Sequence, residues 1–178
     1  KYFKDLYKDV PLDVYEILLY ILCIGVLLFL ITKGFRRGWR LVSGLMLVEY
    51  VVLLFFTTVF SRNYREAPKF NMTPFWSYTE IINGKQNLIP EILMNVVVFA
   101  PVGLFLGFTF SELKWKGILV VAVCISLLIE ILQFILHRGF SELDDVMHNT
   151  IGCIAGYGAY RLMRYGYEKI GEKVDVVE

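Results

Sequence analysis

The chain has 178 residues, of which 57% are hydrophobic and 20% are charged, and its formal net charge is +1. So high an apolar fraction excludes an ordinary water-soluble domain, and the near-neutral charge excludes the basic surface that nucleic acid binding requires. We therefore expect an all-α fold, a polytopic membrane bundle of about five transmembrane helices with a short extracytoplasmic interfacial helix.

Five apolar stretches define the expected membrane-spanning helices. A helix needs about 20 apolar residues to cross the bilayer core, because its backbone must satisfy its own hydrogen bonds there. The stretches run from Val14 to Thr32, Leu41 to Phe60, Ile92 to Phe110, Gly117 to Leu136 and Val146 to Met163. The last is the weakest, because polar and small residues interrupt it. We expect one membrane domain over residues 1–178, with a tail at residues 164–178.

Residues 61–91 separate the second and third stretches. This segment is too polar to span the bilayer, yet it contains closely spaced aromatic residues such as Trp76, which is typical of an interfacial element. Thr73 followed by Pro74 predicts an N-cap with proline at the first helical position, and Gly84 can end the short helix.

The loop at residues 33–40 indicates the orientation. It contains four basic residues and no acidic residue, which places it in the cytoplasm by the positive-inside tendency. The amino terminus is then expected outside and the carboxyl terminus in the cytoplasm. Basic residues in segment 61–91 oppose this assignment, although long loops weigh less in the rule.

Polar residues recur in three of the expected helices. Glu130 and Gln133 share one face of the fourth helix. Asp145 and Asn149 share one face at the start of the fifth, and Asn95 lies in the third. At about 1.5 Å of rise per residue, Asn95 and Glu130 lie on the order of 8–10 Å below the outer surface, and Asn149 lies at a similar depth. We therefore expect a polar cluster in the outer half of the bilayer.

Glu130 requires a partner in this cluster, because an unpaired carboxylate at membrane depth is costly. Asn95, Gln133, Asn149 and Arg138 are the candidate partners. Two readings stay open: the cluster is a functional site, or its polar groups only hold the helices together. Arg138 also has a simple alternative role, since a basic residue at a helix end can extend to the membrane interface.

Glycine spacing favours close helix packing. Gly103 and Gly107, and likewise Gly152 and Gly156, form GxxxG patterns that can bring the polar faces together. Ser141 and Asp144 have the spacing of a capping box, so Asp144 is expected to be structural.

The sequence predicts no cofactor and no metal site. The three cysteines form no CxxC pair, and the histidines lack the HExxH spacing. Glu130 and Asp145 are the candidate catalytic residues, because a carboxyl group in apolar surroundings suits general acid–base chemistry. No residue is identified as a nucleophile.

Four motifs follow one another in the second half of the chain. Residues 71–75 read N-x-x-P-F, and residues 95–103 read N-x-x-x-F-x-P-x-G. Residues 130–138 contain E-x-x-Q and a trailing arginine, and residues 145–152 read D-x-x-x-N-x-x-G. In this order, over about residues 71–157, they resemble the VanZ-like family of membrane proteins.

The resemblance implies a multi-pass protein of the bacterial plasma membrane, linked to teicoplanin or lipoglycopeptide resistance, without a settled biochemical activity. His148 departs from the family pattern, which usually has an apolar residue at this position.

Three functions remain open. In the first, an outer-leaflet pocket binds or remodels a lipid-like envelope component, with membrane lipids, a lipid-linked envelope molecule or a lipoglycopeptide as partner. The second is an intramembrane transferase or hydrolase that acts on a lipid-linked envelope precursor. The third is a small transporter or flippase, for which a homodimer is an alternative to one chain. The expected binding residues are Asn71, Trp76, Asn95, Gln133, Arg138 and Asn149.

Overall fold

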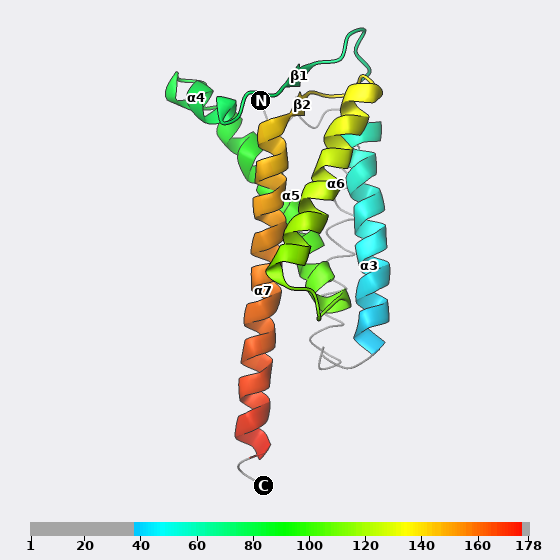
Figure 1. Cartoon of the computed structure of the whole chain (residues 1–178), viewed down its shortest axis with the longest axis vertical. Coiled ribbons are helices and arrows are strands. Elements are labelled where there is room, and N and C mark those ends of the chain that lie inside the picture. The colour runs from blue at the N-terminus through cyan, green and yellow to red at the C-terminus, as the bar shows by residue number, and fades with distance from the viewer. Residues whose placement is uncertain (1–37, 176–178) are drawn as a thin grey trace.

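The computed structural model describes the backbone of residues 38–175 and the side chains of residues 40–169. The expected first span, residues 14–32, lies outside the described residues. The elements in order are α3 (Gly38–Phe55), the π-helical turn η1 (Phe56–Phe60), β1 (Phe70–Asn71), α4 (Trp76–Ile82), α5 (Leu88–Thr109), α6 (Trp115–Ile135), β2 (Ser141–Glu142) and α7 (Leu143–Asp175). The predicted all-α bundle is confirmed (Figure 1).

Three of the described helices are long and apolar enough to cross a membrane. They are Arg40–Phe60, Leu88–Thr109 and Trp115–Ile135, and they lie close to the second, third and fourth expected spans. α7 is not among them, because polar and charged residues interrupt its sequence. It contains the fifth expected span and then continues as helix through most of the expected tail, to Asp175.

α5 and α7 pack backbone against backbone through their glycines. A Cβ atom added to Gly103 would lie 1.8 Å from the carbonyl oxygen of Cys153. One added to Gly156 would lie 1.7 Å from the carbonyl oxygen of Ala100. Only hydrogen atoms fit in these places, so the close packing predicted from the GxxxG patterns is confirmed.

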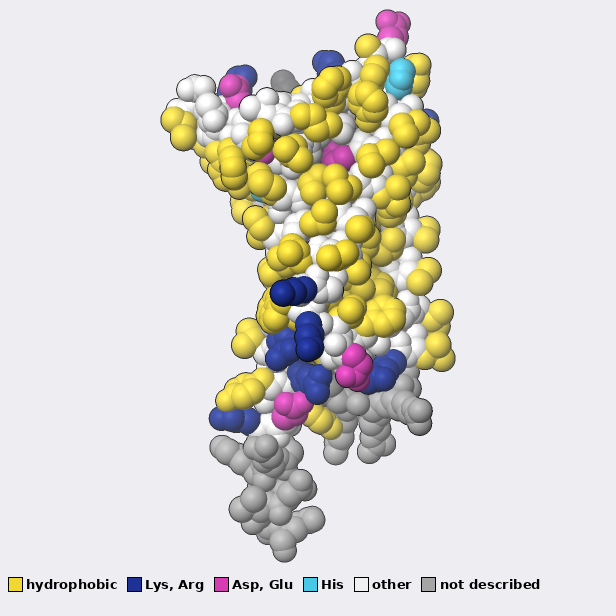
Figure 2. Space-filling model, in the orientation of Figure 1, with side chains coloured by type: hydrophobic (Ala, Val, Ile, Leu, Met, Phe, Trp, Pro, Cys, Tyr) yellow, Lys and Arg dark blue, Asp and Glu magenta, His cyan; other side chains and the backbone are white. Residues whose placement is uncertain are grey.

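The two ends of the bundle differ in chemistry. Figure 2 shows Lys and Arg side chains gathered toward the carboxyl end of α7, below a broad hydrophobic belt. There Arg40 at the start of α3 pairs with Glu112, 3.1 Å away, after the end of α5. The opposite end, where α5 and α7 begin and α6 ends, is called the polar end below.

Short backbone pairings close the polar end. β1 and β2 pair in parallel, with Phe70 opposite Ser141 and Asn71 opposite Glu142. The pairing holds the segment after η1 against the loop between α6 and α7. This loop therefore lies across the top of the bundle (Figure 1).

The structure corrects the predicted start of the interfacial helix. α4 begins at Trp76, and the residue before it, Phe75, has a left-handed backbone with φ 61°. Thr73 and Pro74 precede this turn and do not cap the helix. Gly84, with φ +100°, follows α4 as expected, because glycine adopts this conformation without steric cost.

Candidate functional site

A cavity of about 80 Å³ lies at the polar end, where α5, α6 and α7 meet the segments that cross over them. Its charged lining residues are Arg62, Glu91, Glu142 and Asp145. Its polar lining residues are Ser77, Asn95, Gln133 and His148. Of the expected site residues, the cavity therefore brings together Asn95, Gln133 and Asp145.

The cavity volume limits what can enter. The space holds several water molecules or one small polar group. Sites for drug-sized ligands are much larger, on the order of 300–1,000 Å³. In this conformation only the polar end of a larger molecule fits.

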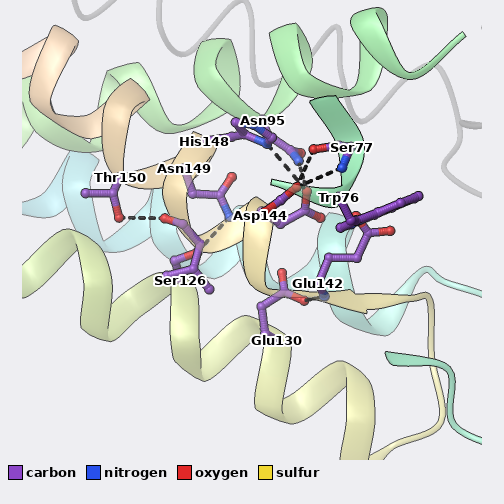
Figure 3. Close-up of polar contacts among 12 residues, drawn as sticks. Trp76, Ser77, Asn95, Ser126, Glu130, Glu142, Asp144, His148, Asn149 and Thr150 are labelled. Carbon is purple, nitrogen blue, oxygen red and sulfur yellow. Dashed lines mark hydrogen bonds and ion pairs between the residues drawn. The ribbon is translucent and has the colours of Figure 1, made fainter. Parts of the chain in front are cut away.

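Asp145 of α7 contacts α5 directly at the cavity wall and lies near His148, which reaches α4. Asn95 of α5, labelled in Figure 3, donates a hydrogen bond from Nδ2 to Oδ1 of Asp145, at 2.7 Å. His148 Nδ1 lies 3.9 Å from the same carboxylate oxygen, and His148 Nε2 lies 3.0 Å from the hydroxyl of Tyr78 on α4. His148 is only 1% exposed, so the position that departs from the family pattern is part of the wall.

Glu130 has different partners from those expected. Its Oε2 accepts a hydrogen bond from the backbone N–H of Glu142 at 2.8 Å, and the Ser141 side chain bonds to it as well. Figure 3 shows Glu130 of α6 pointing toward β2. The expectation of Asn95, Gln133, Asn149 or Arg138 as partner is wrong, because the loop after α6 folds back over the helix end and supplies nearer donors.

Gln133 has a hydrogen-bond acceptor without a partner. Its Nε2 donates to the carbonyl oxygen of Thr58 in η1 at 2.9 Å, which ties α6 to the π-helical turn. Its Oε1 has no hydrogen-bond partner, although the side chain is only 7% exposed. A buried acceptor without a partner is costly, so this oxygen favours a donor inside the cavity.

Asn149 lies deeper than the cavity and does not line it. Its Nδ2 donates to the hydroxyl of Ser126 at 2.8 Å, a contact between α7 and α6. This is the interhelical role that amide side chains commonly have in membrane bundles.

The remaining expected binding residues lie around the cavity. Trp76 donates a hydrogen bond from Nε1 to Oε2 of Glu142 at 3.1 Å, so it contacts a residue of the cavity wall without lining the cavity itself. Arg138 donates to the backbone carbonyl oxygens of Phe60 and Arg62. Asn71 Oδ1 accepts from the backbone N–H two residues on. Arg138 and Asn71 thus hold loops in place, and their roles in binding stay predictions.

Asp144 caps α4 from a distance. It is fully buried, and its carboxylate accepts hydrogen bonds from the backbone N–H of Phe75 at 2.7 Å and of Ser77 at 2.9 Å. The Ser77 hydroxyl donates to it at 2.5 Å. The expected capping box with Ser141 is therefore wrong. Asp144 has a structural role, but it stabilises the start of α4 and not the start of α7, the helix to which it belongs.

Glu142 is a titratable group of the site that lies in β2, outside the described helices that are apolar enough to cross a membrane. Burial raises its pKa to about 8, and the negative charges of Asp145 and Glu91 act in the same direction. The Trp76 hydrogen bond opposes this increase. At neutral pH the group is therefore close to its titration range.

This pKa predicts a pH dependence of stability. Because folding raises the pKa of Glu142 from 4.5 to about 8, its contribution is complete below pH 4.5 and is lost as the pH rises through 8. We expect the melting temperature of the detergent-purified protein to fall between pH 5 and pH 9, and Glu142→Gln to flatten the curve. Glu112→Gln, an exposed control, should leave the curve unchanged, and equal slopes for both variants would contradict the assignment.

Sequence reasoning missed Arg62, Glu142 and His148 as site residues. Glu91 could have been predicted as a site residue, because it lies four residues before Asn95 and therefore on the same helical face. In the described part of the chain, no group of three or more His, Cys, Asp or Glu residues is placed to hold a metal ion.

Comparison with known proteins shows the family of the chain. The family model described as VanZ/LLP1 matches residues 17–164. Protein VanZ of Enterococcus faecium is 31% identical over 130 residues, which cover 69% of this chain and 76% of that protein. No solved structure gives a significant match.

Proposed function

This chain belongs to the VanZ/LLP1 family, and from that premise we propose that its polar cavity binds the polar end of a lipid-like envelope component and thereby contributes to teicoplanin resistance. The single observation that carries the proposal is the cavity itself. Three carboxyl groups and one guanidinium group line it, at the end of a bundle in which three of the described helices are apolar enough to cross a membrane.

The charge imbalance favours a ligand site over simple helix packing. Charged groups at membrane depth are costly, and a purely structural cluster would pair each of them. Here Glu91, Glu142 and Asp145 line one cavity with Arg62. Carboxylates held together in this way are typical of functional sites.

The distribution of basic residues supports an outward-facing cavity. Arg161 and Arg164 of α7, with Lys114 and Lys116 before and within the start of α6, belong to the end opposite the cavity. By the positive-inside tendency this basic end lies in the cytoplasm of the bacterium. The cavity then opens toward the outer leaflet.

α4 has the composition of an interfacial cover. It projects sideways from the polar end (Figure 1), with Phe75, Tyr78 and Ile82 exposed. Exposed aromatic and aliphatic side chains beside a polar site suit the boundary between head groups and acyl chains. The cavity thus lies where the head group of a membrane-embedded molecule would be.

An intramembrane transferase or hydrolase is the second candidate. It is favoured by the position of Asp145, whose charge acts on Glu130, so that two carboxyl groups are placed for acid–base chemistry. Among the described residues that line the cavity, Ser77 is the one with an aliphatic hydroxyl group. This hydroxyl donates its proton to Asp144, which already caps α4. This arrangement supports capping more than a serine nucleophile, so we rank binding first.

Drug susceptibility tests the proposal. A teicoplanin-sensitive Gram-positive host should become less susceptible when it expresses the wild-type chain, and Asp145→Asn should lose most of this protection at matched membrane levels. Asn at position 145 can still accept the Asn95 N–H, so the loss would report the charge rather than the fold. Full protection by this variant would refute the proposed site.

A further inference from the structure

The sign of charge in the cavity restricts its ligand. Glu91, Glu142 and Asp145 line a cavity of about 80 Å³ together with Arg62, and Glu130 is close enough for Asp145 to act on it. Burial raises the pKa of Glu142 to about 8, so this group is mostly protonated at neutral pH, and a bound cation would favour its charged form. Carboxylates confined in this way attract a cation. A ligand that is only anionic, such as an isolated phosphate, does not fit this wall.

The hydrogen-bonding groups restrict the ligand further. The amide N–H of Asn95 is directed to Asp145, and His148 Nε2 is engaged by Tyr78. Two buried atoms of the wall have no hydrogen-bond partner: Gln133 Oε1, which is an acceptor, and His148 Nδ1, which donates or accepts depending on the tautomer. Apart from Arg62, the wall thus offers mainly acceptors, and the matching group is a donor.

A primary ammonium satisfies both conditions, since it carries a positive charge and three N–H donors. A quaternary ammonium has no N–H, and proteins usually hold it in an aromatic cage. Among the described residues that line this cavity, Phe140 is the single phenylalanine, tyrosine or tryptophan. One ring does not form an aromatic cage.

We propose that the cavity takes the primary ammonium of an aminophospholipid, and that Arg62 at its wall pairs with the phosphate of the same head group. This assignment rests on the proposed function and specifies its substrate class. An ammonium group is small enough for the cavity, whereas the glycerol and acyl chains remain outside, beside α4. A guanidinium group is suited to bind phosphate, and the carboxylates around it would hold the ammonium.

Trp76 provides the reporter for a test, because its indole N–H donates to the cavity residue Glu142. The full chain with Trp39→Phe and Trp115→Phe would be placed in phosphatidylglycerol nanodiscs. Increasing fractions of phosphatidylethanolamine or phosphatidylcholine would then be included, and ethanolamine would be added to a separate sample. We expect phosphatidylethanolamine to change Trp76 emission in a saturable way, phosphatidylcholine to have no effect, and ethanolamine to act only at far higher concentration.

Two charge-removing variants complete the test. Glu91→Gln should raise the half-saturating fraction of phosphatidylethanolamine about tenfold or more, because one partner of the buried cation is lost. Glu112→Gln, at the opposite end of the bundle, should respond like the parent. Equal responses to both zwitterionic lipids, or no change in Glu91→Gln, would overturn the ammonium assignment and leave lipid binding standing. A response to ethanolamine alone would assign a soluble amine and refute the lipid, and no response to any of these probes would refute the head-group site as a whole.

Discussion

Replacement of Gly156 by alanine should separate α5 from α7 and destabilise the bundle by at least about 2 kcal/mol, since overpacking commonly costs 1–3 kcal/mol. The added Cβ would lie 1.7 Å from the carbonyl oxygen of Ala100, and backbone atoms on both helices would have to move. The Asn95–Asp145 hydrogen bond crosses the same interface, so we expect the cavity to be lost as well. The measurement is thermal unfolding of the detergent-purified protein.

Gly166 of the same helix is the matched control. A Cβ added there would meet no heavy atom within 4 Å, and alanine is the better helix former by about 1 kcal/mol. Gly166→Ala should therefore keep or slightly raise the melting temperature. Equal melting temperatures for Gly156→Ala and the parent would contradict the close packing of α5 and α7.

Replacement of Asp144 by alanine should release α4 from the bundle. The change leaves the backbone N–H groups of Phe75 and Ser77 and the Ser77 hydroxyl without their acceptor. Each buried donor left unpaired costs about 1–3 kcal/mol. We expect fast amide hydrogen exchange across residues 76–82 and a red shift of Trp76 emission, whereas exchange in α5 and α6 stays slow.

Two further variants show whether the effect comes from these bonds. Asp144→Asn keeps one carbonyl acceptor and should give an intermediate exchange rate. Glu66→Gln removes an exposed carboxylate from the segment between η1 and α4 and should change nothing. Slow exchange across α4 in Asp144→Ala would show that α4 is held by other contacts.

The helices were predictable because their signals are local. About 20 consecutive apolar residues determine a membrane helix whatever its neighbours, so the second, third and fourth spans lie close to their expected positions. The GxxxG pairs likewise carry their packing role in the sequence, because only glycine lets two backbones approach so closely.

The polar end was predictable only in part, because its contacts join segments that lie far apart in the chain. Helical periodicity placed Asn95, Gln133 and Asp145 on inward faces, and all three line the cavity. Periodicity contains no information on the loop after α6, which supplies the partners of Glu130. It is also silent on Asp144, whose hydrogen bonds reach residues almost seventy positions earlier.

The short interfacial helix shows how a local rule fails. Thr73 and Pro74 have the composition of a helix start, yet the donors at the beginning of α4 are satisfied by a charged group from another helix. A buried carboxylate accepts such bonds more strongly than a threonine hydroxyl does. The tertiary contact therefore sets the start of the helix at Trp76.

The most direct test of the central claim is teicoplanin susceptibility of a sensitive Gram-positive host that expresses either Glu91→Gln or Glu112→Gln. The two variants make the same chemical change at opposite ends of the bundle, one in the cavity wall and one in an exposed ion pair. If the polar cavity is where the protein acts, Glu91→Gln loses protection and Glu112→Gln keeps it at equal membrane levels. Full protection by Glu91→Gln, or equal loss in both, would contradict the account.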